Sequence, residues 1–175
     1  MNPTILTLMG LLMGPAPSQA LSPIPVFVYG SSVVPPGTLL EGRREAVRVL
    51  REAGVETQWF ECFPSPDGAQ LEPACGGALL PSHLLVRIVT RWKREHNRER
   101  SGSAVLMEML GKAVCREQIG GNYISIYYNA VDKLARGSDS RRARLLGYAL
   151  AHEIGHLLLG PQHSTGIMAA DWAEK

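Results

Sequence analysis

Two histidines four residues apart, with a glutamate directly after the first, most strongly limit what this chain can be. His152, Glu153 and His156 form an H-E-x-x-H motif in a largely apolar segment. On an α-helix, side chains four residues apart lie on one face, so both imidazoles can reach one metal ion. The Glu153 carboxylate then flanks the metal, where it can accept a proton from a water molecule that the metal activates. The motif therefore predicts a helix that carries two zinc ligands and a general base.

The residues after the motif predict a third ligand. Gly160 is the residue type that ends many helices, and Pro161 cannot continue one. The chain then turns back, and His163 follows as the candidate third ligand. Three protein ligands with an open fourth position are the arrangement of a catalytic zinc site rather than a structural one.

The competing interpretation is a buried helix whose two histidines are only hydrogen-bonded. An H-E-x-x-H run arises by chance in a chain of this length with odds of roughly one in a few hundred. Gly137, Ser138 and Asp139 form a helix start, and the apolar side of that helix continues into the motif. A third histidine after a clear helix stop favours the metal site.

Six residues resemble the signature of the metzincin clan of zinc metallopeptidases, H-E-x-x-H-x-x-G-x-x-H followed by a methionine turn: His152, Glu153, His156, Gly160, His163 and Met168. The resemblance implies that the three histidines bind one Zn²⁺ and that Glu153 is the general base. It also implies that Met168 forms the turn beneath the metal.

Two departures from the family pattern bear on the site. Leu159 stands where the family has its glycine, and Gly160 comes one residue later, with the spacing to the last histidine unchanged. Seven residues follow the methionine, whereas metzincins carry a further C-terminal segment that walls the substrate pocket. Asp171 and Glu174 are candidate substitutes for the third ligand, and both rank behind the histidine.

Composition and the first residues predict one exported domain. The chain has 175 residues, 45% of them hydrophobic, and a formal net charge of +2, which suits one core and is too mild to indicate a nucleic-acid partner. Residues 1–20 hold a short apolar run and end in Ser-Gln-Ala, as a signal peptidase requires. They predict a signal peptide, followed by a catalytic domain of residues 21–175 that is secreted or periplasmic and makes no membrane contact. Because the first residues lack Lys and Arg, a packed or disordered N-terminal segment is the alternative.

Three cysteines in an exported protein are expected to form one disulfide and leave one thiol. Cys62 and Cys75 bracket a loop rich in Pro, Gly and Asp, so they are the favoured pair. Closing that loop would contribute about 3 kcal/mol. Cys115 is expected to be a buried thiol, because nothing near it in the sequence pairs it with a base.

The remaining apolar patterns predict a mixed, mostly parallel twisted sheet with two main helices. Strands are predicted over residues 24–29, 55–63, 84–90 and 122–128. Thr38 and Glu41 form a capping box that opens a helix ending at Gly54. Strand, helix and strand in so short a stretch imply a parallel pair. Residues 84–90 are almost continuously apolar, so this strand is expected to be central.

Residues 103–114 are ambiguous between strand and helix. The metzincin resemblance implies that part of them is an antiparallel edge strand, along which an extended peptide adds as another strand. The predicted fold is therefore α/β (α+β) with a metzincin-like core over residues 24–168. Only the last thirty or so of these residues carry a specific signature.

The predicted function is a zinc-dependent endopeptidase that hydrolyses a peptide or protein substrate. The alternatives are an exported metal-binding protein of the same fold without peptidase activity, and an exported interaction module without a metal. A nucleic-acid binder based on the basic residues 91–100 is disfavoured, because acidic residues interleave them. The sequence does not indicate cleavage specificity, oligomeric state or how activity is restrained.

Overall fold

The computed structural model describes residues 22–62, 73–90, 110–115 and 122–170. The predicted signal peptide, the basic segment 91–100, Asp171 and Glu174 lie outside these residues. Over the described part, the chain is a mixed α/β structure with three α-helices and one sheet of five strands. None of the described helices has the length and apolar character needed to cross a membrane.

The sheet is mostly parallel. Its strands are β1 (Ile24–Tyr29), β2 (Thr57–Glu61), β3 (Leu84–Val89), β4 (Gly111–Cys115) and β5 (Asn122–Tyr127). They lie in the order β2-β1-β3-β5-β4, and only the β4–β5 pair is antiparallel. The parallel β1–β2 pair and the central position of β3 are confirmed. Part of the ambiguous region 103–114 belongs to β4, an antiparallel edge strand.

The first helix begins earlier than predicted. Helix α1 (Pro36–Glu52) follows Pro35 as its N-cap residue, so the predicted capping box of Thr38 and Glu41 was wrong. Two prolines fix their φ angles near the helical value and need no N–H partner, which suits a helix start. At the other end Gly54 adopts φ 80° and ends the helix, as predicted.

A short helix that was not predicted precedes the long one. Helix α2 (Tyr128–Ala135) begins directly after β5, so the predicted strand 122–128 is one residue too long. Helix α3 (Asp139–Leu159) then starts within the predicted segment of Gly137, Ser138 and Asp139. Its N-cap is Ser138, whose hydroxyl accepts a hydrogen bond from the Arg141 N–H at 3.4 Å. The Arg142 guanidinium pairs with Asp132 of α2 at 2.6 Å and joins the two helices.

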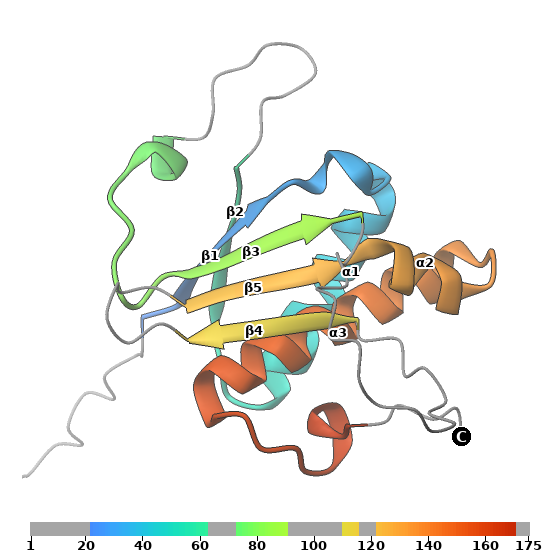
Figure 1. Ribbon diagram of the computed structural model, residues 1–175. Helices are drawn as coiled ribbons and strands as arrows, with labels where there is room; N and C mark the ends of the chain where they lie inside the picture. Colours follow the sequence, from blue (N-terminus) through green and yellow to red (C-terminus); the bar gives the residue numbers. More distant parts are fainter. Residues whose placement is uncertain (1–21, 63–72, 91–109, 116–121, 171–175) are drawn as a thin grey trace, which may run out of the picture.

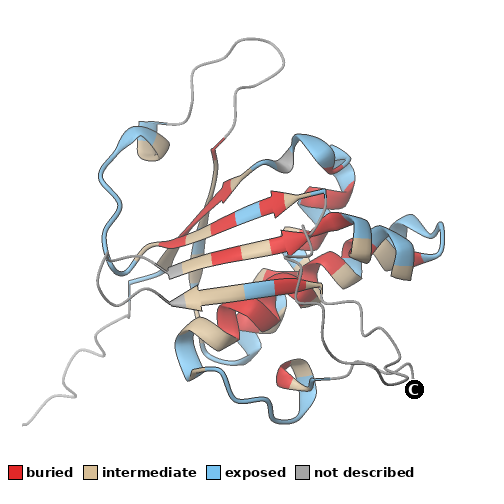
Figure 2. Ribbon diagram, in the orientation of Figure 1, coloured by how far each residue is buried: buried red, intermediate tan, exposed pale blue. Residues whose placement is uncertain are grey.

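Helices α1 and α3 cover one face of the sheet (Figure 1). The hydrophobic core lies between these helices and the sheet (Figure 2). Fully buried aliphatic residues from both layers fill it: Val26, Val86, Ile124, Ile126, Leu146, Leu150 and Ile154. The two helices approach closely at Gly147, where an added Cβ would lie 2.7 Å from the Gly42 carbonyl oxygen. This packing places the last turns of α3 beside β4.

Candidate metal centre

The H-E-x-x-H motif lies in the second half of α3. His152 and Glu153 are buried, with 9% and 6% of their surfaces exposed, and His156 is half-buried. Burial lowers the pKa of His152, and the neighbouring imidazoles of His156 and His163 lower it further, although the hydrogen bond to Ile167 opposes them. A lowered pKa keeps the imidazole neutral, which is the form that binds a metal ion.

Backbone carbonyls fix the orientation of both helical imidazoles. His152 Nδ1 donates to the Ile167 carbonyl at 2.7 Å, and His156 Nδ1 donates to the Gly160 carbonyl at 3.1 Å. Each ring therefore keeps its proton on Nδ1 and presents the lone pair of Nε2, as metal-ligating histidines commonly do.

The two Nε2 atoms lie 3.0 Å apart. Two nitrogen ligands of a tetrahedral zinc ion, each at about 2.0–2.1 Å, would lie about 3.3 Å apart. Facing lone pairs at such a separation repel each other unless a cation lies between them. The spacing and the tautomers therefore fit a shared metal ion.

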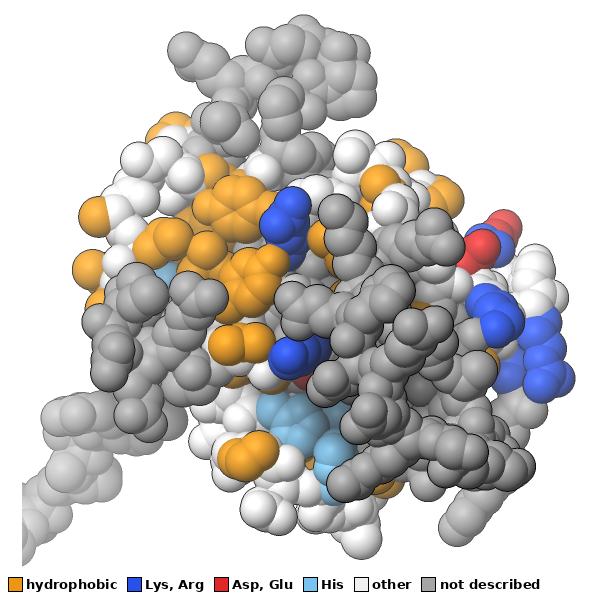
Figure 3. Space-filling model, viewed as in Figure 1, with side chains coloured by type: hydrophobic (Ala, Val, Ile, Leu, Met, Phe, Trp, Pro, Cys, Tyr) orange, Lys and Arg blue, Asp and Glu red, His pale blue; other side chains and the backbone are white. Residues whose placement is uncertain are grey.

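The third predicted ligand joins this pair. His163 lies in the exposed turn after α3, and ligand nitrogens of His152, His156 and His163 all lie within 4.8 Å of one another. The His163 ring is 5.4 Å from that of His152 and 4.8 Å from that of His156, centroid to centroid. Figure 3 shows histidine side chains gathered at the surface beside the lower edge of the sheet. These three histidines could hold a metal ion together.

Met168, the methionine of the predicted turn, packs against Gly155 of α3. Met168 belongs to the 3-10 helix η3 (Gly166–Met168) and is buried. A Cβ at Gly155 would overlap the Met168 sulfur. The absence of a side chain at Gly155 therefore leaves room for this methionine against α3.

The carboxylate of Glu153 faces the edge strand. An added Cβ at Gly111 of β4 would lie 2.7 Å from Glu153 Cγ and 2.8 Å from its Oε1. Burial raises the pKa of Glu153 to about 7, although a backbone hydrogen bond from Ala113 opposes this rise. Burial also raises the pKa of Tyr127, and the Glu153 charge contributes to that. A carboxyl group with a pKa near neutrality can both accept and donate a proton at physiological pH.

Comparisons with known protein families, with curated proteins and with solved structures find no match to this chain. The interpretation of the site therefore depends on its own residues.

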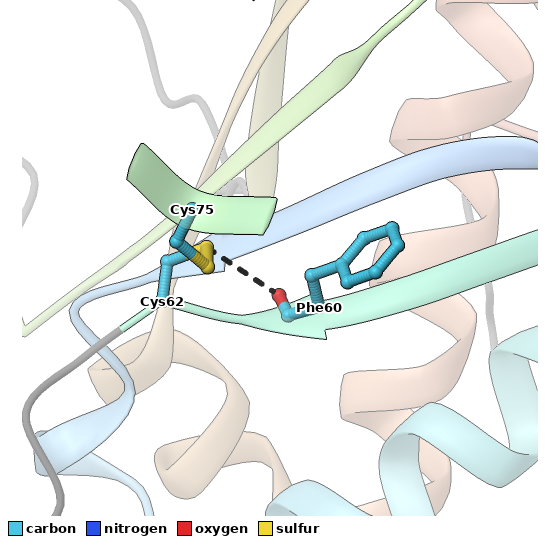
Figure 4. The surroundings of a disulfide bond; sticks show 3 residues. All are labelled: Phe60, Cys62 and Cys75. Atoms are coloured by element: carbon cyan, nitrogen blue, oxygen red, sulfur yellow. Dashed lines mark hydrogen bonds between the residues drawn. A yellow bond between two sulfur atoms is a disulfide. The ribbon is translucent and has the colours of Figure 1, made fainter. Parts of the chain in front are cut away.

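The predicted disulfide is present at the other edge of the sheet. Cys62 follows β2 and is bonded to Cys75 in the 3-10 helix η2 (Pro73–Gly76), as Figure 4 shows. Their Cα atoms lie 5.5 Å apart, an ordinary distance for such a bond. Because β2 and β4 form opposite edges, the disulfide is remote from the histidines.

The contact between β4 and Glu153 was not predicted. Gly111 and Ala113 supply space and a backbone N–H to Glu153. An isolated glycine in a strand commonly marks a close approach by another group, so Gly111 was the available signal. Without knowledge of the strand's bounds or neighbours, the sequence could not show that this group is Glu153.

Proposed function

We propose that this protein is a zinc-dependent endopeptidase with a metzincin-like core. The observation that carries the proposal is the convergence of three imidazoles, the first of which is followed in the sequence by the buried Glu153. His152, His156 and His163 would hold the metal. Imidazole also suits copper, iron and nickel, and zinc is preferred because a three-histidine site open at its fourth position is typical of catalytic zinc.

A bound zinc ion supplies Lewis acidity, which polarises the scissile carbonyl and lowers the pKa of water. Glu153 accepts a proton from the attacking water at its carboxylate and then delivers it to the departing amine nitrogen. A pKa near 7 supports both transfers. The Nδ1 hydrogen bonds of His152 and His156 hold the ligand nitrogens in place throughout.

The substrate would be an extended peptide. Strand β4 pairs with β5 on one side and forms an edge of the described sheet next to Glu153. An edge strand presents backbone groups to which a peptide can add as a further strand, although in β4 the Ala113 N–H already bonds Glu153. The disulfide supports a secreted or periplasmic location, where such bonds persist.

The test is Glu153→Gln in the zinc-loaded protein, assayed with a mixed peptide library. Because glutamine has the same shape but no basic oxygen, we expect zinc binding to be retained and cleavage to fall by at least about 10²–10⁴-fold. Elemental analysis of both proteins measures the zinc. Cleavage by the variant at the wild-type rate would remove Glu153 from the mechanism.

The alternative is a metal-binding protein without peptidase activity. Zinc-loaded wild-type protein that cleaves nothing in the library would support it. The raised pKa of the buried Glu153 carboxyl group favours the enzyme, because a site that only stores metal does not require a general base.

A further inference from the structure

The hydrogen-bonding pattern of β4 shows which of its backbone groups face outward. The Tyr127 N–H donates to the Leu110 carbonyl at 2.9 Å, which makes these two residues a hydrogen-bonded antiparallel pair. Such pairs alternate with pairs that are not hydrogen-bonded. In the register Gly111↔Ile126 and Ala113↔Ile124, the backbone groups of Gly111 and Ala113 therefore point away from β5, toward the outer edge.

Glu153 occupies this outer edge from the helix side. It accepts a hydrogen bond from Ala113, one of the outward-facing N–H groups. Its methylene and carboxylate atoms lie where a side chain at Gly111 would begin, with Cγ, Oε1 and Cδ at 2.7, 2.8 and 2.9 Å from an ideal Cβ. Real Cβ atoms essentially never approach other atoms closer than 3.0 Å. An alanine at this position would therefore force the carboxylate to move.

We propose that β4 positions the general base, and that Gly111 is a positioning residue for the proposed peptidase reaction. Gly111 leaves room for the Glu153 side chain, and the Ala113 N–H fixes its carboxylate. The proposal rests on the proposed function for its catalytic consequence. The packing of Gly111 against Glu153 is testable without any activity.

The first test is a double-mutant cycle on the stability of the metal-free protein. Gly111→Ala is measured in wild-type, Glu153→Gln and Glu153→Ala backgrounds. We expect it to lower Tm by about 5 °C in the first two, because the overlapping atoms are present in both. In the Glu153→Ala background the overlap is gone, and alanine is favoured over glycine in a strand. There the same substitution should leave Tm unchanged or raise it.

An equal loss in all three backgrounds would overturn the proposal, because Gly111 would then serve the strand and not Glu153. If the Gly111→Ala single variant fails to fold, the double variant still tests the proposal. A folded Gly111→Ala/Glu153→Ala double variant supports the proposal, and an unfolded one overturns it.

The second test separates positioning of the base from general damage to the site. In the folded Gly111→Ala variant, we expect kcat to fall about 10²-fold with KM little changed, because the base is displaced while the substrate edge remains. The absorption spectrum of the Co²⁺-substituted protein should be unchanged, since the histidines are untouched. An altered Co²⁺ spectrum, or an unchanged kcat, would overturn the positioning role. Absence of cleavage by the wild-type protein would instead overturn the proposed function, and the stability cycle would still show how Glu153 is held.

Discussion

His163 is the proposed ligand that most needs an experiment, because it lies in an exposed turn while the other two proposed ligands lie on a helix. We expect His163→Ala to weaken zinc binding by more than about 100-fold, a larger loss than changes behind the ligands cause. The stability of the metal-free protein should change by less than about 0.5 kcal/mol, since the side chain is exposed. Competition with a chromogenic chelator measures the affinity.

His83→Ala is the matched control for that experiment. His83 lies outside the cluster, against the Phe27 ring, and its loss should leave the zinc affinity unchanged. Asp171→Ala and Glu174→Ala test the two substitute ligands. A zinc affinity that survived loss of His163 but not of one of these carboxylates would reassign the third position.

Glu153 gives a second prediction, on the pH dependence of stability. Its pKa in the folded, metal-free protein is about 7, above the ordinary 4.5. The folded state therefore binds this proton more tightly than the unfolded state, and the corresponding stability is present below pH 4.5 and lost as pH rises through 7. With EDTA present, we expect Glu153→Gln to be more stable than wild type at pH 8 by on the order of 2–3 kcal/mol.

The two proteins should be equally stable at pH 4, where the wild-type carboxyl group is also neutral. Urea unfolding at both pH values makes the comparison. A variant less stable than wild type at pH 8 would mean that the ionised carboxylate is well solvated or paired in the folded protein.

At the scale of elements, the close approach of α1 and α3 predicts an intolerant position. An alanine at Gly147 would bring its Cβ to 2.6 Å from Glu45 Cβ and 2.7 Å from the Gly42 carbonyl oxygen. Backbone in a packed helix cannot yield as a flexible side chain can, so we expect a loss of about 1–3 kcal/mol despite a gain in helix propensity of about 1 kcal/mol. Thermal unfolding measures it.

Gly37→Ala is the control for Gly147→Ala. Gly37 also lies in a helix, α1, but an added Cβ there would have nothing within 4 Å. It should be neutral or stabilise the protein by up to about 1 kcal/mol. If the two substitutions changed the stability equally, helix propensity, and not the distance between the helices, would determine the effect of each.

The elements that were predicted correctly are those with a local signal. Strand β1 stands at its predicted bounds, and Ser138 caps α3 through its own hydroxyl. The error at α1 had a local cause too, because two prolines and a capping box competed and the prolines prevailed. Helix α2 was missed because Tyr128 continues the alternation of β5, and a helix this short leaves little periodic pattern.

The candidate site also has a part with a local signal in the sequence and a part without one. The histidines, the glutamate and the methionine come from one stretch of sequence, and helical spacing alone brings His152 and His156 together. The fit of Glu153 against Gly111 joins residues far apart in the chain. Such a contact depends on the register of β4 beside α3, which no local pattern encodes.

At the scale of the whole molecule, the disulfide stabilises the edge of the sheet opposite the histidines. Cys62 and Cys75 are separated by 13 positions in the sequence, so replacing both by serine should lower the free energy of unfolding by about 3 kcal/mol. Urea unfolding measures this loss. Zinc affinity should not change, because β2 is remote from the cluster. A matching fall in zinc affinity would mean that the two edges are coupled through the sheet.

The ligands and the base differ in how much of the fold they require. The metal would be bound by a single helix and the turn after it. Hydrogen bonds from His152 to the Ile167 carbonyl and from His156 to the Gly160 carbonyl hold this helix and turn together. The proposed proton transfer would also depend on β4, a strand much earlier in the chain that contacts Glu153. We therefore expect substitutions that loosen the sheet to yield protein that still carries its metal but turns nothing over, so metal content alone is a poor measure of correct folding.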